Sequence, residues 1–347
     1  MPLENNHASQ TILVTGAAGF IGFHVSKALL ALGHKVIGLD NLNDYYDVNL
    51  KLARLTELGI AKDDATQELN EVVSSSHGDR MIFVKMNLED REALPALCKK
   101  YQFDSICNLA AQAGVRYSLE NPEAYADSNL IGFLNVLECC RNFKISKLVY
   151  ASSSSIYGNS DAVPFEETAN VDHPISLYAA TKKANELMAH AYSHLYGFET
   201  IGLRFFTVYG PWGRPDMAMF LFTDAILNNR PVKIFNNGDL SRDFTYIDDI
   251  VAGVLATLLK SSENSSNYKL YNIGNSQPVQ LLEYIEAIET ALDKKAIREM
   301  MPMQPGDVKQ TYANVNLLNK DFDYQPTTEV KKGIAAFVEW YRNFYNK

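Results

Sequence analysis

Short apolar runs alternate with amphipathic segments along the first 150 residues of the chain. Each run is about five residues long and rich in β-branched or aromatic residues, which is typical of a strand. The segments between the runs repeat apolar residues at helical spacing. This alternation predicts parallel strands joined by right-handed helical crossovers, in a sheet covered on both faces. The predicted strands are 11–16, 35–40, 81–88, 105–111 and 147–153, and the predicted helices are 24–33, 94–101 and 134–143.

The pattern changes further along the chain. Residues 59–79 are polar and charged, and we interpret them as a surface excursion between the second and third strands. Residues 200–206 predict one more strand, after which Pro and Gly become frequent, as in YGPWGRPD and MQPGD. Such punctuation predicts a smaller, loop-rich lobe that closes over an edge of the sheet. The last amphipathic stretch, 330–345, predicts a terminal helix.

Length and charge limit the classes of ligand. At 347 residues the chain exceeds the usual size of a single core, in line with one large lobe and a smaller one. The net charge of -9 argues against nucleic acid as the main ligand, because a phosphate backbone demands a basic surface. A small phosphorylated ligand is still compatible with this charge, since it needs only a local cluster of donors.

Neither a membrane nor a metal is expected as a partner. No run of 18 apolar residues exists, and the first ten residues lack the basic and apolar regions of a signal peptide, so we expect a cytoplasmic protein. None of the four cysteines forms a C-x-x-C pair, and no spacing suits a zinc site. Cys139 and Cys140 lie in an apolar helical stretch, which predicts buried thiols in a reducing compartment.

A glycine-rich turn follows the first predicted strand and opens the first helix. Its glycines are Gly16, Gly19 and Gly22. In a dinucleotide site such glycines permit the tight turn, the approach of the backbone to a pyrophosphate and the packing of helix on strand, while the helix N-terminus supplies N–H donors. The spacing departs from the usual G-x-G-x-x-G, so the motif alone also fits a merely structural turn.

The end of the second predicted strand narrows this choice. That strand ends in Asp40, a residue type that in this place accepts hydrogen bonds from the adenosine ribose and repels a 2′-phosphate. No Arg or Lys stands at positions 41–44 to bind such a phosphate. Together with the glycine turn, Asp40 predicts a Rossmann-type site for NAD rather than NADP.

Tyr178 and Lys182 are spaced i and i+4, which places them on one face of a helix. A phenol with an ordinary pKa of about 10 is a poor base at neutral pH, and a nearby ammonium together with a positive nicotinamide ring lowers that pKa. An exposed tyrosine beside a solvated lysine gives the same spacing. The pair follows the strand 147–153, whose end carries Ser152–Ser155, and this position favours catalysis with a serine hydroxyl relaying the proton between substrate and tyrosine.

In this order, the three features resemble the extended short-chain dehydrogenase/reductase family. Residues 11–330 are similar to the UDP-glucuronate 4-epimerases of its NAD-dependent epimerase/dehydratase branch. The longest signature is RFFTVYGPWGRPDMA, which begins at Arg204. The others are DNLNDYY from Asp40, AAQAGVRYS from Ala110, GDLSRDFTY from Gly238 and MQPGDV from Met303.

The resemblance implies an enzyme that epimerises carbon 4 of a UDP-sugar with bound NAD, through a 4-keto sugar that turns within the site. Tyr178 takes the proton of the 4-hydroxyl, Lys182 supports it, and Ser153 or Ser155 relays the proton. Asn87 stands where relatives have Asp, and its amide can still hydrogen-bond the adenine. The cofactor residues implied are Gly16, Gly19, Phe20, Ile21, Gly22, Asp40, Asn41, Asn43, Asn87, Leu88, Leu109, Ala110, Ala111, Asn129, Tyr178, Lys182 and Phe206.

The resemblance also implies UDP-glucuronate as substrate and UDP-galacturonate as product. The 4-keto intermediate would be a β-keto acid, so the site must anchor its carboxylate against loss of carbon dioxide. We assign Thr207 and Arg214 to this task, with loop anchoring as the alternative for Arg214. Arg116 and Arg242 are placed on the diphosphate, although either could instead form a surface ion pair. The substrate residues implied are Gln112, Arg116, Ser153, Ser154, Thr207, Arg214, Arg242 and Asp307.

Other activities stay open at this point. A UDP-glucose or UDP-N-acetylglucosamine 4-epimerase is the first alternative. A dehydratase or decarboxylase is disfavoured because residues 153–155 hold no carboxylate, and a catalytically silent NAD-sensing module because both Tyr178 and Lys182 are present. The resemblance further implies a homodimer, an NAD-binding Rossmann domain with the Ser/Tyr/Lys group over 11–200, and a nucleotide-sugar lobe over most of 201–347, with some segments returning to the sheet.

Overall fold

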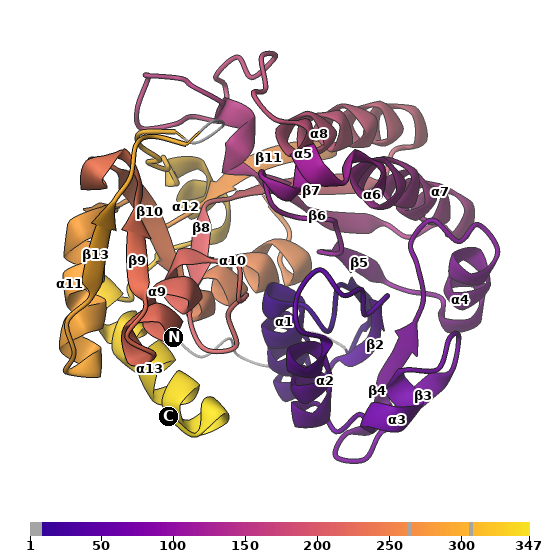
Figure 1. Cartoon of the computed structure of the whole chain (residues 1–347). Coiled ribbons are helices and arrows are strands. Elements are labelled where there is room, and N and C mark those ends of the chain that lie inside the picture. The colour runs from indigo at the N-terminus through magenta and orange to yellow at the C-terminus, as the bar shows by residue number, and fades with distance from the viewer. Residues whose placement is uncertain (1–8, 263–264, 305–307) are drawn as a thin grey trace.

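The computed structural model describes residues 9–262, 265–304 and 308–347. Its largest sheet is built, within these residues, from eight strands in the following spatial order (Figure 1). They are β11 (Tyr268–Ile273), β7 (Glu199–Phe205), β6 (Lys147–Ser153), β5 (Ser105–Asn108), β1 (Thr11–Thr15), β2 (Lys35–Asp40), β4 (Gly78–Lys85) and β3 (Glu71–Ser74). All neighbours pair in parallel except β3 and β4. Since β1 has both β2 and β5 as neighbours, the strand order reverses there, which is where such sheets bind ligands.

The predicted strands are confirmed, and β2 and β6 have the predicted bounds. Two strands end earlier than their apolar runs, at Lys85 in β4 and at Asn108 in β5. The apolar residues that follow leave the sheet and enter loops, among them Met86, Leu88 and Leu109. All three line the cavity described below, and Met86 and Leu88 also belong to the apolar core, so the apolar pattern continues past the strands because of the core as well as the cavity.

Residues 59–79 are more than a surface excursion, since they add the edge strand β3 to the sheet. Val72 of this strand is buried, whereas Val73 faces outward. Glu71 accepts a hydrogen bond from the hydroxyl of Tyr101 at 2.6 Å, which ties the strand to the helix that ends at Tyr101. The prediction missed β3 because two valines between charged flanks are too short an apolar run to indicate a strand.

Helices cover both faces of the large sheet, which confirms the doubly wound α/β arrangement (Figure 1). Ile12 and Val14 of β1 pack toward one face, and Leu13 packs toward the other. Cys139 and Cys140 are buried as free thiols, as predicted. The first face is covered by α1 (Phe20–Ala31), α10 (Ile247–Leu259) and α12 (Asn316–Phe322), and the second by α4 (Ala93–Tyr101), α7 (Gly132–Phe143) and α8 (Leu177–Tyr196).

A smaller lobe follows β7 and has its own apolar core. Phe244 stacks on Tyr284 there with ring centres 3.8 Å apart, and Phe337 of the predicted terminal helix packs against Phe220. Its strands form the sheets β12-β10-β8 and β13-β9. The elements of the lobe are β8 (Thr207–Tyr209), α9 (Ala218–Leu227), β9 (Pro231–Ile234), β10 (Ser241–Tyr246), β12 (Pro278–Gln280), α11 (Leu281–Leu292), β13 (Ile297–Met300) and α13 (Val330–Tyr345).

Short helices connect these elements. Where the structure describes the chain, no helix combines the length and the apolar content that a bilayer demands. The connecting helices are α2 (Val48–Glu57), α3 (Lys62–Ala65), α5 (Tyr117–Glu120), α6 (Pro122–Tyr125), the π-helix η1 (Ala126–Ile131) and the 3-10 helices η2 (Ser154–Tyr157) and η3 (Phe235–Gly238).

Candidate active site

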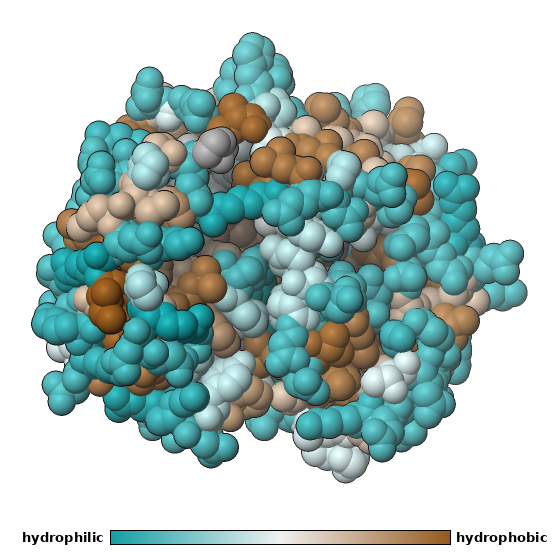
Figure 2. Space-filling view, in the orientation of Figure 1, coloured by the Kyte–Doolittle hydropathy of each residue, from teal (hydrophilic) through white to brown (hydrophobic). Residues whose placement is uncertain are grey.

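A cavity of about 720 Å³ lies between the carboxyl ends of the main strands and the smaller lobe, and the surface is hollowed between these two parts (Figure 2). Its walls join strand-end residues such as Asp40 and Ser153 to lobe residues such as Phe244 and Leu281. The predicted site residues that line it are Gly16, Gly19, Phe20, Ile21, Gly22, Asp40, Asn41, Asn43, Leu88, Leu109, Ala110, Ala111, Gln112, Arg116, Ser153, Ser154, Ser155, Tyr178, Lys182, Phe206, Thr207, Arg214 and Arg242.

The glycine turn forms one wall of the cavity. Gly16 has a φ of +71°, a left-handed conformation that favours glycine. A Cβ on Gly22 would lie 2.1 Å from the carbonyl oxygen of Gly16, so only glycine lets α1 pack this closely on the turn. Gly19 precedes α1, and no described side chain caps the helix or adds an acid to its first turn. The first N–H groups of α1 are therefore suited to an anion such as the diphosphate of a dinucleotide.

Asp40 lines the cavity at the end of β2. Its carboxylate accepts hydrogen bonds from the backbone N–H groups of Ala18 at 3.2 Å and Leu42 at 2.9 Å. Lys51 on α2 lies 3.9 Å from this carboxylate and donates to the backbone and side-chain oxygens of Asn43, both at 2.8 Å. Our sequence reading missed Lys51 because it considered only the positions directly after Asp40. The charge of Lys51 is balanced by Asp40, so the pair offers no excess positive charge to a 2′-phosphate.

Two predicted cofactor residues, Asn129 and Asn87, do not line the cavity. Asn129 is buried on η1, where its Oδ1 accepts from the N–H of Gln112 at 2.8 Å and its Nδ2 donates to the C=O of Gln112 at 3.0 Å. It therefore shapes the loop after β5 from behind the wall. Asn87 is exposed, and the neighbouring Leu88 faces the cavity in its place, because the chain has already left β4 at this point.

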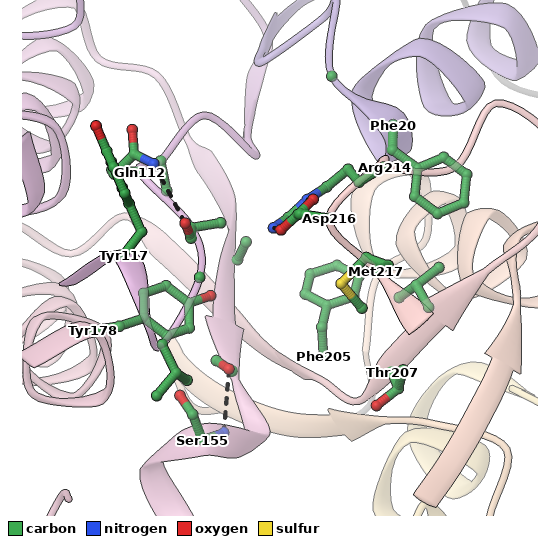
Figure 3. Close-up of a pocket in the computed structure, with 18 of the residues that line it drawn as sticks. Phe20, Gln112, Tyr117, Ser155, Tyr178, Phe205, Thr207, Arg214, Asp216 and Met217 are labelled. Atoms are coloured by element: carbon green, nitrogen blue, oxygen red, sulfur yellow. Dashed lines mark hydrogen bonds and ion pairs between the residues drawn. The ribbon is translucent and has the colours of Figure 1, made fainter. Parts of the chain in front are cut away.

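Tyr178 points into the cavity from the first turn of α8 (Figure 3). The helix begins after Ser176, whose hydroxyl accepts the N–H of Ala179 at 3.1 Å and so fixes this turn. One turn later, the ammonium of Lys182 lies 6.0 Å from the centre of the Tyr178 ring and donates to the backbone oxygen of Ala151 at 2.8 Å. The i, i+4 spacing thus brings the phenol and the ammonium together at the end of β6.

The serines at the end of β6 have different surroundings. Ser152 donates to the carboxylate of Glu186 at 2.7 Å. The hydroxyl of Ser153 accepts the N–H of Ser155 at 3.2 Å, and it lies near enough to Tyr178 to lower the pKa of the phenol. The hydroxyl of Ser155 is buried and has no hydrogen-bond partner among the described residues. Ser153 therefore lies beside the phenol at the strand end, whereas Ser155 offers a hydroxyl that a ligand or a water molecule could satisfy.

Burial shifts the pKa values of Tyr178 and Lys182 in opposite directions. It raises the pKa of Tyr178, and the contact with Ser153 and the positive charge of Arg214 offset this only in part. Burial lowers the pKa of Lys182 to about 8. The phenol is therefore a weaker acid than usual and stays protonated by itself, and additional positive charge at the cavity is needed before it gives up its proton at neutral pH.

Arg214 has a partner in the cavity that the sequence did not indicate. Its guanidinium forms a bidentate ion pair with Asp216, from Nε to Oδ1 at 3.0 Å and from Nη2 to Oδ2 at 2.5 Å (Figure 3). Tyr45 donates its hydroxyl to the same carboxylate at 3.1 Å. Burial would lower the pKa of Arg214, but the charge of Asp216 raises it above its ordinary value. Asp216 and Tyr45 stand inside two of the signature sequences, yet nothing in their spacing shows that the side chains meet.

The other predicted substrate residues lie on the side of the lobe. Thr207 begins β8, and Arg242 lies on β10, where its guanidinium donates to two backbone oxygens at 2.9 and 3.1 Å. Arg116 is exposed, and its guanidinium lies 5.4 Å from the centre of the Phe235 ring. Asp307 lies outside the described residues. Among the described residues, His, Cys, Asp and Glu side chains form no group of three that could hold a metal ion.

Residues 12–274 match the model of the NAD dependent epimerase/dehydratase family. The chain belongs to this family. Curated relatives from the epimerase/dehydratase family include a probable UDP-glucuronate 4-epimerase of Rhizobium meliloti, which is 45% identical over 96% of this chain and 98% of its own length. UDP-glucuronate 4-epimerase 4 of Arabidopsis thaliana is 45% identical over 97% of this chain and 76% of its own length.

A solved structure of the epimerase/dehydratase family has the same fold. UDP-glucuronic acid 4-epimerase from Bacillus cereus, in complex with UDP-glucuronic acid and NAD, matches with a TM-score of 0.84 and 31% identity, over 96% of this chain and 100% of that chain. The predicted Rossmann-type fold and the dependence on NAD are therefore confirmed.

Proposed function

We propose that this chain epimerises carbon 4 of UDP-glucuronate, with UDP-galacturonate as the product. One observation carries the choice of a uronic acid: the cavity that holds Tyr178 also presents Arg214 and Thr207. A guanidinium and a hydroxyl are suited to a carboxylate, whereas a neutral sugar has no need of the charge. The names of the relatives from Rhizobium meliloti and Bacillus cereus support the same substrate. UDP-glucose and UDP-N-acetylglucosamine are the alternative substrates.

The cavity residues fit NAD along the glycine turn. We assign the diphosphate of NAD to the first turn of α1, between Gly19 and Gly22, and the adenosine ribose to Asp40. Tyr178 and Lys182 would then hold the nicotinamide half. When bound, NAD would supply the hydride chemistry at carbon 4 of the sugar. The chain itself holds the reactants in place, excludes water and moves the proton.

We assign residues 11–200 to NAD binding and catalysis, and residues 201–347 mainly to the nucleotide sugar. Two features support this division. Phe244 and Leu281 of the lobe line the same cavity as the glycine turn. The later segments that return to the large sheet, β11, α10 and α12, lie away from the lobe core and pack with β7 and α1. Arg242 of the lobe is our candidate for the sugar diphosphate.

Tyr178 exchanges the proton of the sugar 4-hydroxyl in this proposal. Ser153 lies beside the tyrosine at the strand end, so it is placed to pass the proton between sugar and phenol. Lys182 holds its charge beside the ring, which stabilises the phenolate. The same groups return the proton after the keto sugar has turned, so the chain ends each cycle in its starting state.

A uronic acid brings a hazard that Arg214 and Thr207 are placed to control. The 4-keto form of the sugar is a β-keto acid, and it loses carbon dioxide when its carboxylate leaves the plane of the carbonyl group. Two or more donors from one guanidinium fix both the position and the plane of a carboxylate. We therefore assign Arg214 and Thr207 to hold the carboxylate while the ring turns.

Elimination or decarboxylation would need an acid near carbon 5 of the sugar. The cavity does contain a carboxylate that the sequence reading missed, Asp216. Burial would raise its pKa, but the charge of Arg214 and the hydrogen bond from Tyr45 lower the pKa below its ordinary value, so Asp216 is a poor proton donor at neutral pH. This favours epimerisation over a dehydratase or decarboxylase.

Incubation with sugar nucleotides tests the proposal. The purified protein is given UDP-glucuronate, UDP-glucose or UDP-N-acetylglucosamine, and the products are followed by proton NMR. We expect UDP-glucuronate and UDP-galacturonate to interconvert without loss of mass. Release of carbon dioxide or water, or turnover of the neutral sugars alone, would contradict the proposed function.

We expect kcat/KM for UDP-glucuronate to fall as the pH rises above the pKa of Lys182. Below this pKa of about 8 the amine is protonated and stabilises the phenolate of Tyr178, whereas above it the neutral amine gives no such support. Arginine stays charged over this range, so the Lys182→Arg enzyme should lack the alkaline decline even if it is slower overall. A parent profile that stays flat well above the pKa would argue against this role for Lys182.

Arg214→Ala is expected to lower kcat/KM for UDP-glucuronate about 30-fold or more, with a far smaller effect on any turnover of UDP-glucose. The variant loses the guanidinium and leaves Asp216 as an uncompensated negative charge that repels a uronic acid. Arg230→Ala is the matched control, because Arg230 also pairs with an aspartate, Asp224, but does not line the cavity. Unchanged use of UDP-glucuronate by Arg214→Ala would remove Arg214 from the carboxylate site.

We also infer that the chain forms a homodimer and that it acts in a reducing compartment, the cytoplasm. The product would there serve the synthesis of surface polysaccharide. The helix α8 exposes Leu187 and Leu195 two turns apart, with 59% and 66% of each residue accessible, and such a stripe suits a partner helix. All four cysteines are buried and free, which agrees with a reducing environment. Light scattering tests the dimer, and the mass of a single chain would contradict it.

A further inference from the structure

Asp216 pairs with Arg214, the same residue to which we assign the carboxylate of the substrate. Arg214 uses its Nε and one Nη2 hydrogen on Asp216, in the same two-pronged way in which a guanidinium takes any carboxylate. Both side chains line the cavity, and they keep 24% and 29% of their surface exposed. Two residues apart on one loop, they form a pair that a ligand in the cavity can reach.

A uronic acid that enters this cavity would bring a third charge to the pair. One guanidinium would then face two carboxylates, with a net charge of -1 in a partly buried place. Like charges this close disfavour each other, so the substrate carboxylate and Asp216 compete for Arg214. A neutral sugar has no such conflict, since it leaves the ion pair as it is.

We propose that Asp216 is a placeholder for the substrate carboxylate: it neutralises Arg214 while the cavity holds no uronic acid, and gives up the guanidinium when one binds. This inference rests on the proposed function, since it assumes that the carboxylate of UDP-glucuronate goes to Arg214. The placeholder keeps a partly buried guanidinium from standing uncompensated, and it keeps small anions off it. In return, the affinity for the uronic acid is lower than the contacts of Arg214 alone would give.

Tyr45 gives Asp216 a second partner to keep. Its hydroxyl donates to Oδ2 at 3.1 Å, and its ring lies 4.8 Å from that of Tyr117. The hydroxyl also lies close to Gly114, where an added Cβ would come within 2.6 Å of it, so a glycine there leaves room for the tyrosine to reach Asp216. When Arg214 turns to the substrate, the carboxylate of Asp216 therefore retains a hydrogen bond and is not left unsatisfied.

Hydrogen bonds from Arg54 and His24 hold the backbone just before Arg214, so Arg214 can change its partner from Asp216 to the substrate by side-chain movement alone. Arg54 is buried and donates to the backbone oxygen of Trp212 at 2.7 Å and to that of Ala18 in the glycine turn at 2.9 Å. His24 adds a hydrogen bond of 3.0 Å to the backbone oxygen of Pro211. The loop is thereby tied to the cofactor wall just before Arg214.

Dissociation constants test the placeholder. They are measured by calorimetry for UDP-glucuronate and UDP-glucose with the NAD-loaded protein, in a Tyr178→Phe background so that neither sugar is consumed. We expect Asp216→Asn to bind UDP-glucuronate about fivefold more tightly relative to UDP-glucose, because the competing charge is gone. Tyr45→Phe should shift the ratio the other way, about threefold, because the displaced Asp216 then loses its remaining donor.

The lobe surface offers a matched control. Asp224 pairs with Arg230 and accepts a hydrogen bond from the hydroxyl of Tyr341 at 2.8 Å, the same three side-chain types outside the cavity. Asp224→Asn should leave the ratio of the two constants unchanged. An Asp216→Asn protein that binds UDP-glucuronate no better, or worse, relative to UDP-glucose overturns the placeholder. If that protein shows the expected shift while the parent fails to epimerise UDP-glucuronate, the proposed reaction fails and the placeholder stands.

Discussion

Tyr178→Phe is expected to lower kcat for UDP-glucuronate about 10²- to 10⁴-fold, the usual contribution of a positioned acid–base group. The change removes only the hydroxyl that meets Ser153, and keeps the ring that packs against Tyr125 with centres 6.1 Å apart. The protein should therefore keep its fold and its NAD content, while the sugar 4-hydroxyl has no group to take its proton. Initial rates by proton NMR, with the NAD content read by absorbance after denaturation, measure both parts of this expectation.

Tyr196→Phe is the control for this variant, because Tyr196 ends the same helix and is exposed at the surface. It should interconvert the sugar nucleotides at the rate of the parent. A Tyr178→Phe protein that is equally fast would sink the whole assignment of the acid–base group. A Tyr178→Phe protein that has lost its bound NAD would instead show that the hydroxyl serves the cofactor.

The alternation of apolar runs predicted most of the large sheet, because each run is longer than a turn and buried on both faces. β2 and β6 were predicted to the residue, since Asp40 and Ser153 mark the points where polar groups enter the cavity. Loops after β4 and β5 looked like strands, since Leu88 and Leu109 line the cavity and also pack against the apolar cores on the two faces of the sheet. β3 was missed because its apolar part is too short.

The site was predictable where one short segment carries the chemistry. The glycine turn and the pair Tyr178 and Lys182 each lie within one turn or one helix, so spacing fixes their geometry. Tyr45 was missed because it meets Asp216 from a different loop, and Lys51 because it reaches Asp40 from a separate helix, and local sequence holds no record of which elements meet. Asp216 stands only two residues from Arg214, but this spacing alone does not show that the two side chains form an ion pair. Contacts of this kind follow from the packing of the two lobes.

A buried network beside the catalytic residues could not be predicted from local sequence either, because its members come from different elements. Glu186 lies one turn after Lys182 on α8. Its carboxylate accepts hydrogen bonds from Nε and Nη2 of Arg204 on β7, both at 2.9 Å, and from the hydroxyl of Ser152 at 2.7 Å. The guanidinium also donates to the hydroxyl of Tyr157 at 2.9 Å. Both charged residues are about 1% exposed. The network thus joins α8, β6 and β7 directly below the place where the tyrosine, lysine and serine meet.

Glu186→Ala is expected to lower the free energy of unfolding by about 3–5 kcal/mol, because it leaves the charge of Arg204 buried without a partner. Glu138→Ala is the control: Glu138 on α7 pairs with Arg141 at the surface and accepts a hydrogen bond from the hydroxyl of Tyr192 at 2.7 Å, so its loss should cost about 1–2 kcal/mol. Urea unfolding midpoints, converted with the common slope of the transition, measure both values.

A double variant separates the buried charge from the packing. Replacing Glu186 with Leu and Arg204 with Met together removes both charges, and we expect it to regain much of the stability that Glu186→Ala loses. Its turnover should nevertheless stay below that of the parent, because Ser152 loses its acceptor beside Ser153 and the strand end is held less firmly. If Glu186→Ala proved as mild as Glu138→Ala, the ion pair would not be what holds α8 against the sheet, and the position of Tyr178 would have to rest on the apolar contacts of the helix alone.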